Sequence, residues 1–372
     1  MSKKIIIYGA YDDGNFGDDL LLFMILDWLE EYNFINNIYV SSSKSDLKKH
    51  YKTINLLDKN IAKNQSCDLF IMGGGTQFFS FKKDDATIKS NIFTKISKVL
   101  KNPVLLYLRL KNLISVKPQY NKKIAIGIGL GPFENKNKLS AIINNLKSYD
   151  DIFVRDKIAK FLCDENDVKA HIGADICFSD YFVKKYNFIH IRDKNSLPKI
   201  GVVLREWPHN GLGSLINNKI IEWINKNKHK FKISIFLFSE SKDHSLFLKL
   251  IKSTNIHPNI WNLKTMQISH YLNELNKMDI FIASRFHSGV INVNLGIPTI
   301  CLGIDPKLSY LVDEVNGFYY LSIDQNFNLI GSYIQEILKN YKLKQDNILE
   351  SKNVLNSKAN IMFKKLNKYL KQ

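Results

Sequence analysis

An arginine and a histidine stand one residue apart in the stretch SRFHSG at residues 284–289. An apolar run, DIFIA, ends just before them, and HSGVINVNLG has the apolar spacing of a buried helix. Arg285 and His287 are therefore predicted at the N-terminus of a helix, where unpaired N–H groups attract anions. Arginine adds a bidentate contact, and histidine adds a proton that moves near neutral pH. We predict an anion site; the alternative is a capped helix in which both side chains satisfy local carbonyl groups or a carboxylate.

Two other positions have residue types that suit the same anion. Ser284 and Ser288 flank the Arg-x-His pair and either cap the helix or contact the anion. Arg205 follows the apolar run KIGVVL, and an arginine at the end of a buried strand needs an anionic partner. Glu206 is an alternative partner for it, in a plain salt bridge. Trp207, in the loop that follows, is a candidate platform for a sugar.

Two glycine-rich stretches follow apolar runs near the N-terminal end of the chain. In YDDGNFGDD (residues 11–19), Asn15 and Asp18 could bind sugar hydroxyls or cap the next helix. In GGGTQFF (residues 73–79), glycines could let the backbone approach a ligand, although a tight strand-to-helix turn explains them equally well. We interpret FVRD, with Arg155, as a structural ion pair. The candidates for an acceptor side of a cleft are Asn15, Gly74, Gly75, Gln77 and Trp207.

Several chemistries have no motif in this sequence. There is no HExxH, GxSxG, Walker A loop, kinase signature or clear DxD motif, so we expect neither a metal nor a nucleoside triphosphate. The four cysteines show no CxxC pair or regular spacing. They are interpreted as buried thiols of a protein in a reducing compartment.

The chain carries a formal net charge of +18, but its lysines are scattered. This pattern favours a solvated surface over a specific polyanion site, and no nucleic-acid-binding signature accompanies it. Apolar runs such as LLLFMIL fall short of the roughly 18 residues that a membrane span needs. We expect a cytoplasmic protein that is at most peripheral at the inner face of the membrane.

The elements that position these residues alternate along the 372 residues. Apolar strand-like runs separated by helical patterns indicate parallel sheets with both faces covered. The pattern pauses near residue 190 and then begins again. We therefore predict an α/β fold of two doubly wound, Rossmann-like domains, 1–190 and 198–330, which face a cleft. The segment 331–372 is predicted to be helical and to pack back on the first domain. Ligands in such sheets bind beyond the carboxyl ends of the strands, where the candidate residues fall.

The order of these motifs resembles the polysaccharide pyruvyltransferase family. The resemblance runs through GNFGDDLLL, GGGTQF, GIGLGPF, VRD, GADICF and SRFHSGVINVNLGIPTICLGIDPK, roughly residues 4 to 315. The last of these motifs is the most specific. Gln77 stands where the family often has asparagine, which leaves its acceptor contact open.

The resemblance implies a fold like the GT-B glycosyltransferases and transfer of a carboxyvinyl-derived group from phosphoenolpyruvate to a sugar. The product would be a pyruvate ketal on a cell-surface glycan or its lipid-linked precursor, and phosphoenolpyruvate would be a co-substrate with no further cofactor. Arg285 and His287 would lie in the donor site with Arg205. We expect His287 to act as the acid and Asp18 to accept the sugar proton.

Two other functions remain open from the sequence. A GT-B glycosyltransferase that uses a nucleotide sugar would share the architecture and could place its diphosphate on Arg285. A non-catalytic protein of a glycan-assembly system is the other, although the Arg-x-His pair argues against it. Binding to nucleic acid is least expected, because the positive charge is diffuse.

Overall fold

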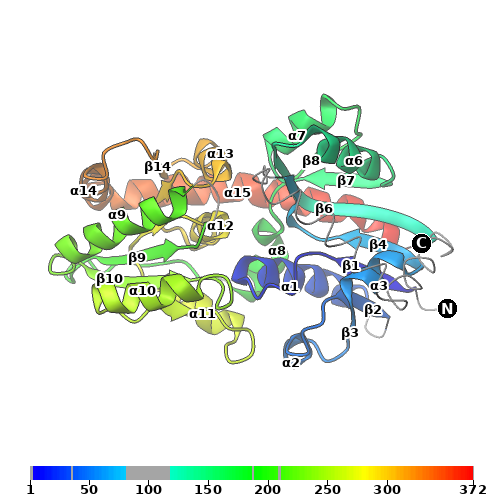
Figure 1. Cartoon of the computed structure of the whole chain (residues 1–372), viewed down its shortest axis with the longest axis horizontal. Coiled ribbons are helices and arrows are strands. Elements are labelled where there is room, and N and C mark those ends of the chain that lie inside the picture. The colour runs from blue at the N-terminus through cyan, green and yellow to red at the C-terminus, as the bar shows by residue number, and fades with distance from the viewer. Residues whose placement is uncertain (1–2, 35–36, 81–117, 187, 208–210, 372) are drawn as a thin grey trace, which may run out of the picture.

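The computed structural model describes residues 3–34, 37–80, 118–186, 188–207 and 211–371. Two parallel β-sheets lie side by side, and the long helix near the C-terminus runs along both (Figure 1). We call the residues of the first sheet and its helices the first half, and those of the second sheet and its helices the second half. The predicted α/β fold class is confirmed, as is the helical C-terminal segment. The residue boundaries of two domains stay a prediction.

The first sheet has the strand order β3-β2-β1-β4-β6-β7-β8, with β5 paired to β6. Its strands are β1 Ile5–Tyr8, β2 Ile38–Ser41, β3 Asn55–Leu57, β4 Cys67–Met72, β5 Gly75–Ser80, β6 Tyr120–Phe133, β7 Asp151–Val154 and β8 His171–Ile172. The helices of this half are α1 Phe16–Glu31, α2 Leu47–His50, α3 Lys59–Asn64, α6 Lys136–Leu146, α7 Lys157–Asp164, the 3₁₀ turn η1 Ile176–Phe178 and α8 Asp180–Lys185.

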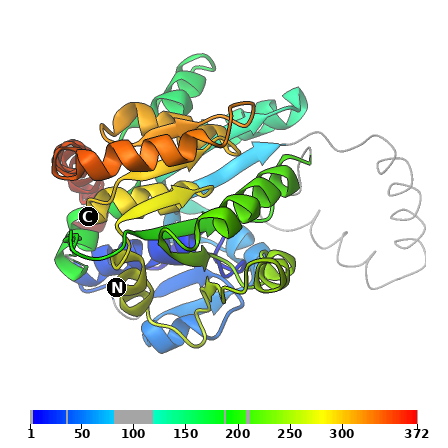
Figure 2. The same cartoon turned by 90° about the vertical axis from the view of Figure 1, so that its left-hand side faces the viewer.

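The second sheet has the order β11-β10-β9-β12-β13-β14, and Figure 2 shows it from its own side with helices on both faces. Its strands are β9 Lys199–Leu204, β10 Lys232–Leu237, β11 Asn259–Ile260, β12 Ile280–Ala283, β13 Thr299–Leu302 and β14 Tyr319–Leu321. The helices are α9 Leu212–Asn227, α10 His244–Thr254, α11 Ile268–Asn276, α12 Phe286–Leu295, α13 Pro306–Glu314, α14 Leu329–Lys339, α15 Tyr341–Leu366 and α16 Lys368–Lys371.

Both sheets reverse their strand order beside their first strand. β1 lies between β2 and β4, and β9 lies between β10 and β12, which is the doubly wound order. The central strands are fully buried apolar runs, such as Ile280–Ala283, because helices cover both faces. Ligands of such sheets bind where the strand order reverses. The segments that follow β1, β9 and β12 are therefore the ones that meet in the cleft.

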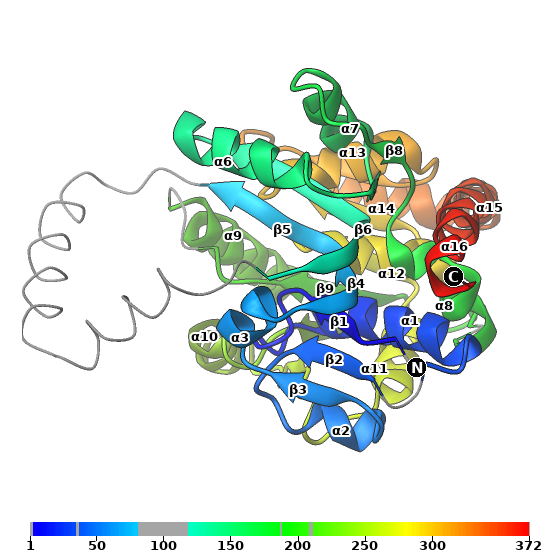
Figure 3. The same cartoon turned by 90° about the vertical axis from the view of Figure 1, so that its right-hand side faces the viewer.

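The C-terminal helices join the two halves. The Gln345 side chain on α15 donates to the carbonyl oxygens of His190, before β9, and Gly296, after α12. Further along, the Trp28 indole of α1 donates to Asn367, and the Tyr369 hydroxyl of α16 donates to Asp151 of β7 at 2.6 Å. Figure 3 shows α15 and α16 beside α1 and α8 of the first half.

The stretch GGGTQFF differs from the strand-to-helix turn expected there. Its last residues form β5, which pairs in parallel with β6 (Figure 3). The glycines leave space for side chains of the first half: a Cβ on Gly73 would lie 1.8 Å from the Tyr11 hydroxyl, and one on Gly74 would lie 2.6 Å from Ile176. Gly75 has a φ of +90°, which side-chain-bearing residues rarely adopt. These glycines serve packing and backbone geometry.

The tip of α1 reaches into the second half. The Phe16 ring contacts the rings of Phe238, Trp261 and Tyr271, with centroids 5.3, 4.8 and 4.7 Å away. The backbone N–H of Phe16 also donates to the Phe238 carbonyl oxygen. One turn on, the Asp19 carboxylate accepts a hydrogen bond from the Trp261 indole at 2.8 Å. This aromatic contact holds the N-terminus of α1 at the cleft.

Two smaller features concern the whole chain. The four cysteines are free and buried, as the sequence indicated. Among the residues that the structure describes, no helix combines the length and the hydropathy needed to cross a bilayer.

Candidate active site

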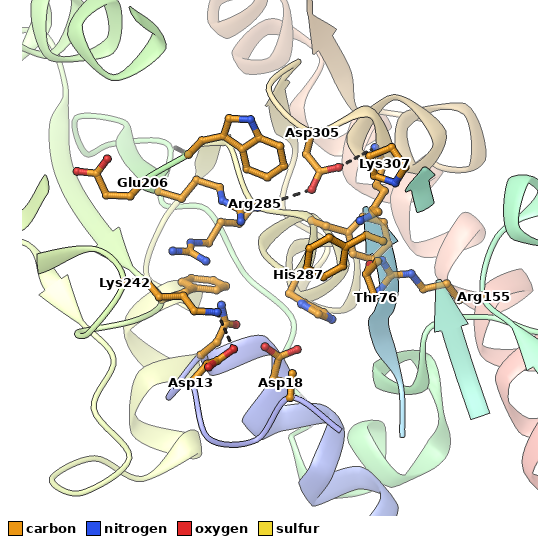
Figure 4. A pocket seen from close by; sticks show the side chains of 18 of the residues that line it. Asp13, Asp18, Thr76, Arg155, Glu206, Lys242, Arg285, His287, Asp305 and Lys307 are labelled. Carbon is orange, nitrogen blue, oxygen red and sulfur yellow. Dashed lines mark hydrogen bonds and ion pairs between the residues drawn. The ribbon is translucent and has the colours of Figure 1, made fainter. Parts of the chain in front are cut away.

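Side chains from both halves line a cavity of about 700 Å³ between the two sheets (Figure 4). Within the described ranges, five lysine or arginine residues and four carboxylic acids face it, together with His287. The charged residues of its wall are Asp13, Asp18, Arg155, Arg205, Glu206, Lys242, Arg285, Asp305 and Lys307. The cavity thus combines apolar surface with many charged side chains, which have a small excess of positive charge.

His287 lies where the sequence predicts it, in the first turn of α12, with Arg285 as the residue before the helix. The side chain of His287 is 14% exposed, and its Nε2 lies 3.6 Å from Oδ2 of Asp175 in the first half. Burial tends to raise the pKa of Asp175, but interaction with His287 and Arg155 outweighs it and lowers this pKa to about 2. Asp175 is therefore a fixed negative charge beside the imidazole.

Asp18 lies in the first turn of α1 and faces the same cavity. Loss of hydration raises its pKa, and the nearby Asp13 adds to this; His287, Lys242 and Arg285 oppose the shift. A carboxylate with a raised pKa is a better proton acceptor than one in water. Asn15, before α1, lines the cavity and accepts a hydrogen bond from the Gly17 N–H at 2.9 Å, so it caps the helix.

Arg285 is held by a buried ion pair. Its guanidinium contacts the carboxylate of Asp243, a fully buried residue that also accepts hydrogen bonds from the N–H groups of Glu206 and Ser239. Asp243 therefore fixes the direction of Arg285 as it lines the cavity. A buried arginine with such a partner presents the rest of its planar fork to a ligand.

Arg205 finds its anionic partner in Asp305, 3.6 Å away, and not in Glu206, which accepts a hydrogen bond from Ser245. The guanidinium lies 4.5 Å from the centre of the Trp207 ring, a stacking distance. Burial lowers the pKa of Arg205 to about 10, and the neighbouring charge of Arg285 contributes. The two arginines are close enough to repel, so an anion between them would be stabilised.

Arg155 is a functional candidate that sequence reasoning placed among structural ion pairs. It directly follows β7, donates to Asp175 at 3.2 Å and to Thr76 of β5 at 3.1 Å, and lines the cavity. Its guanidinium lies 4.0 Å from the centre of the Phe286 ring of α12. The structural role is real, and the same side chain also contributes positive charge to the cavity. Its position directly after a strand could have identified it as a site residue from the sequence.

Lys307 was missed in the sequence, although it follows β13 in the stretch GIDPKL. It lies in the first turn of α13, whose N-cap Asp305 accepts a hydrogen bond from the Lys307 N–H. Burial lowers the pKa of its ammonium to about 8; Asp305 opposes this shift, and the charges of Arg155 and Arg205 add to it. In the described part of the chain, no hydrogen bond or ion pair of Lys307 Nζ is found.

Lys242 and Asp13 form a second pair that the sequence did not reveal. Lys242 Nζ lies 2.7 Å from Asp13 Oδ2, so the pair bridges the second half and the loop after β1 (Figure 4). Neither residue has a motif of its own; only the fold brings the two loops together. The pair closes one side of the cavity beside α1.

Some predicted site residues do not reach the cavity. Ser284 donates to the Val203 carbonyl oxygen and Ser288 accepts from Asn292, and both are buried in the second half. Gly74 and Gly75 are buried in the first half. Trp207 does line the cavity. Gln77 belongs to β5, but its side chain lies outside the described residues. Ser284, Ser288, Gly74 and Gly75 are therefore not among the described residues that line the cavity.

The arrangement can bind a small polyanion and move a proton beside it. Its positive charges and the N-termini of α12 and α13 converge on one cavity, while His287 lies against carboxylates of the opposite half. Within the described residues, no three His, Cys, Asp or Glu side chains lie close enough to hold a metal ion together.

Paired Rossmann-like sheets around such a cleft place the protein in the structural class of the GT-B-like transferases. The chain belongs to the polysaccharide pyruvyl transferase family, whose sequence profile matches residues 15–306. This confirms the resemblance seen in the order of the motifs. No curated protein matches the chain in sequence.

Solved structures share the fold at low identity. Anabaena HepE in complex with UDP-glucose is 8% identical with a TM-score of 0.55, covering 99% of each chain. The putative UDP-N-acetylglucosamine 2-epimerase of Listeria monocytogenes is 12% identical with a TM-score of 0.59, covering 100% of this chain and 96% of that one. A glycosyltransferase from Rickettsia africae is 12% identical with a TM-score of 0.52, covering 100% and 98%. These likenesses concern the fold alone.

Proposed function

We propose that the protein is a ketal-forming pyruvyltransferase that uses phosphoenolpyruvate and a sugar of a cell-surface polysaccharide or its lipid-linked precursor. The observation that carries the proposal is the cavity in which five basic side chains and two helix N-termini surround His287. Phosphoenolpyruvate is a small trianion at neutral pH, and a site for it needs separate partners for phosphate and carboxylate. Membership of the pyruvyl transferase family supports the same donor.

The two anionic ends of the donor have different needs. The phosphate carries the larger charge and suits the group of Lys307, Arg155 and Arg205, whose charges act on one another across the cavity. The carboxylate is planar and suits the fixed fork of Arg285, held by Asp243. In this proposal the N-terminus of α12 supplies further N–H donors to the same anion.

The reaction joins two hydroxyls of the sugar to C2 of the enolpyruvyl group. Two C–O bonds form at C2, the bond from C2 to the phosphate oxygen breaks, and the methylene carbon takes up one proton. One hydroxyl proton thus ends on the methyl group and the other leaves with phosphate or base. We assign the acid role to His287, whose Nε2 lies 3.6 Å from Oδ2 of Asp175, and the base role to Asp18, whose pKa is raised.

The acceptor is proposed to enter from the side of α1. Asn15, Asp13 and Asp18 present side-chain oxygens there, and Trp207 offers an aromatic surface at the cavity wall. Carboxylate and amide oxygens bind sugar hydroxyls, and an aromatic ring covers the apolar face of a sugar. If the acceptor is lipid-linked, the protein works at the inner face of the membrane.

The test is phosphate release from phosphoenolpyruvate in the presence of a panel of sugar acceptors. His287→Ala should lower turnover by about 10²–10⁴-fold, the range of general acid–base catalysis, with the fold intact. His270→Ala, at an exposed histidine of α11, is the matched control and should keep full activity. Near-normal turnover of His287→Ala would remove the assignment. Stabilisation by UDP-glucose and not by phosphoenolpyruvate in a thermal shift assay would favour a nucleotide-sugar transferase.

A further inference from the structure

A glycine of the first half lies directly against the imidazole of His287. A Cβ built on Gly17, the second residue of α1, would meet His287 Nδ1 at 2.2 Å, Cγ at 2.4 Å and Cβ at 2.8 Å. Real Cβ contacts are essentially never shorter than 3.0 Å. The ring therefore rests on the backbone of α1 in the space where a side chain would be.

We propose that Gly17 is a positioning residue for His287, so that the missing side chain on α1 sets the place of the imidazole. The first half contacts the ring on two sides: Gly17 lies against Nδ1, and Asp175 lies 3.6 Å from Nε2. A histidine of the second half is thus contacted by the first half at both ring nitrogens. The inference rests on the proposed function only where activity is its readout.

No other feature of the position requires glycine. The backbone of Gly17 does not have the positive φ that Gly14 has, at +56°, in the same motif. Gly17 is helical and donates its N–H to the Asn15 cap, which any residue could do. Alanine forms helices better than glycine, so the helix alone would favour alanine here. The constraint on Gly17 comes from across the cleft, from His287.

The activity test is Gly17→Ala in the full chain. Alanine should displace the imidazole from its position beside Asp175, which lowers kcat at least tenfold, leaves KM for phosphoenolpyruvate within about threefold and shifts the pH profile of kcat. Gly331→Ala on α14 is the matched control, because nothing lies within 4 Å of a Cβ there. A Gly17→Ala protein with the wild-type kcat and pH profile would overturn the proposal.

A thermal double-mutant cycle tests the contact without the reaction. Gly17→Ala should lower the Tm more when His287 is present than in a His287→Ala background, where the ring is gone and only the contact with the Cβ of residue 287, at 2.8 Å, remains. An equal fall in both backgrounds would overturn the proposal. Because the cycle uses neither phosphoenolpyruvate nor a sugar, it can succeed even if the proposed reaction fails. If Gly17→Ala alone does not fold, the double variant still tests the contact, because it should fold once the His287 ring is removed.

Discussion

The basic side chains of the cavity differ in how far their charge is already neutralised. Arg155, Arg205 and Arg285 each have a carboxylate partner. Lys307 lies at a helix N-terminus beside two arginines, with a lowered pKa and no ion pair within the described residues. A bound phosphate would supply the missing negative charge. Lys307 is therefore the residue whose charge state should depend most on the ligand.

This difference predicts a pH effect on donor capture. The pKa of Lys307 in the free protein is about 8, so its charge is lost as the pH rises through 8. Because kcat/KM reports the free enzyme, kcat/KM for phosphoenolpyruvate should fall above about pH 8. Lys307→Arg stays protonated and should lack this fall. Steady-state rates from pH 6 to 10 measure both; equal profiles for the two proteins would contradict the role of Lys307.

The pKa values of two carboxylates near the His287 imidazole are shifted in opposite directions by their surroundings. The pKa of Asp175 is lowered to about 2 by His287 and Arg155, whereas desolvation raises the pKa of Asp18. Such a split commonly separates an acid–base role from an electrostatic one. In the proposed reaction, Asp175 stays a negative charge beside the imidazole of His287, and Asp18 takes the proton of a sugar hydroxyl. The two carboxylates therefore have different proposed roles in one site.

At the scale of elements, α1 is the part of the first half that builds the cleft. Its N-cap Asn15 and its first-turn residue Asp18 line the cavity, and Phe16 anchors this end of the helix in the second half. The helix itself follows from a run of apolar residues, which bury almost its whole length. The anchor therefore couples the packing of α1 to the position of His287.

Removal of this anchor should cost both stability and rate. Phe16→Ala deletes a fully buried ring and should lower the free energy of unfolding by about 3–5 kcal/mol. It should also lower kcat, since the turn that contacts His287 loses its hold. Urea unfolding and phosphate release measure the two effects. Phe161→Ala on α7, where the ring is 64% exposed, is the control and should change neither. A similar loss in both variants would argue against an anchor.

Strand-end reasoning predicted much of the site because it depends on local pattern. The run DIFIA before SRFHSG gave β12 and the start of α12, and with them Arg285 and His287. The same rule applied to β13 would have found Lys307. It could not predict β5, whose pairing with β6 depends on a partner far along the chain. Nor could it show that Gly17 faces His287, because the two belong to opposite halves.

For the molecule as a whole, helix α15 and the N-terminal end of α1 are two of the elements that hold the halves in one arrangement. Helix α15 runs along both, and α1 inserts Phe16 and Asp19 beside Trp261 of the second half. Gly17 lies between Phe16 and Asp19 in the sequence, and its backbone packs against the imidazole of His287. Any change in the approach of the halves therefore moves the imidazole relative to Asp175. The geometry of the acid–base group is a property of the assembled molecule.

Because Asp19 is buried where the two halves meet, the stability of the folded protein should depend on pH. Burial raises the pKa of Asp19 to about 7 and Asp18 adds to the shift, although the hydrogen bond from Trp261 opposes it. Between its unfolded value of 3.8 and about 7, the folded protein binds more protons than the unfolded chain. Asp19 therefore contributes stability at low pH that is lost as the pH rises through this window, at up to about 1.4 kcal/mol per pH unit.

Asp19→Asn keeps an oxygen for the Trp261 indole and cannot ionise. Its free energy of unfolding should thus gain on that of the wild type as the pH rises from 4.5 to 7.5, because only the wild type has to bury a charge. Urea unfolding of both proteins across this range measures the gain. Asp346→Asn, at an exposed residue of α15, is the control and should run parallel to the wild type. An Asp19→Asn protein that also runs parallel would show that Asp19 is ionised in the folded state throughout.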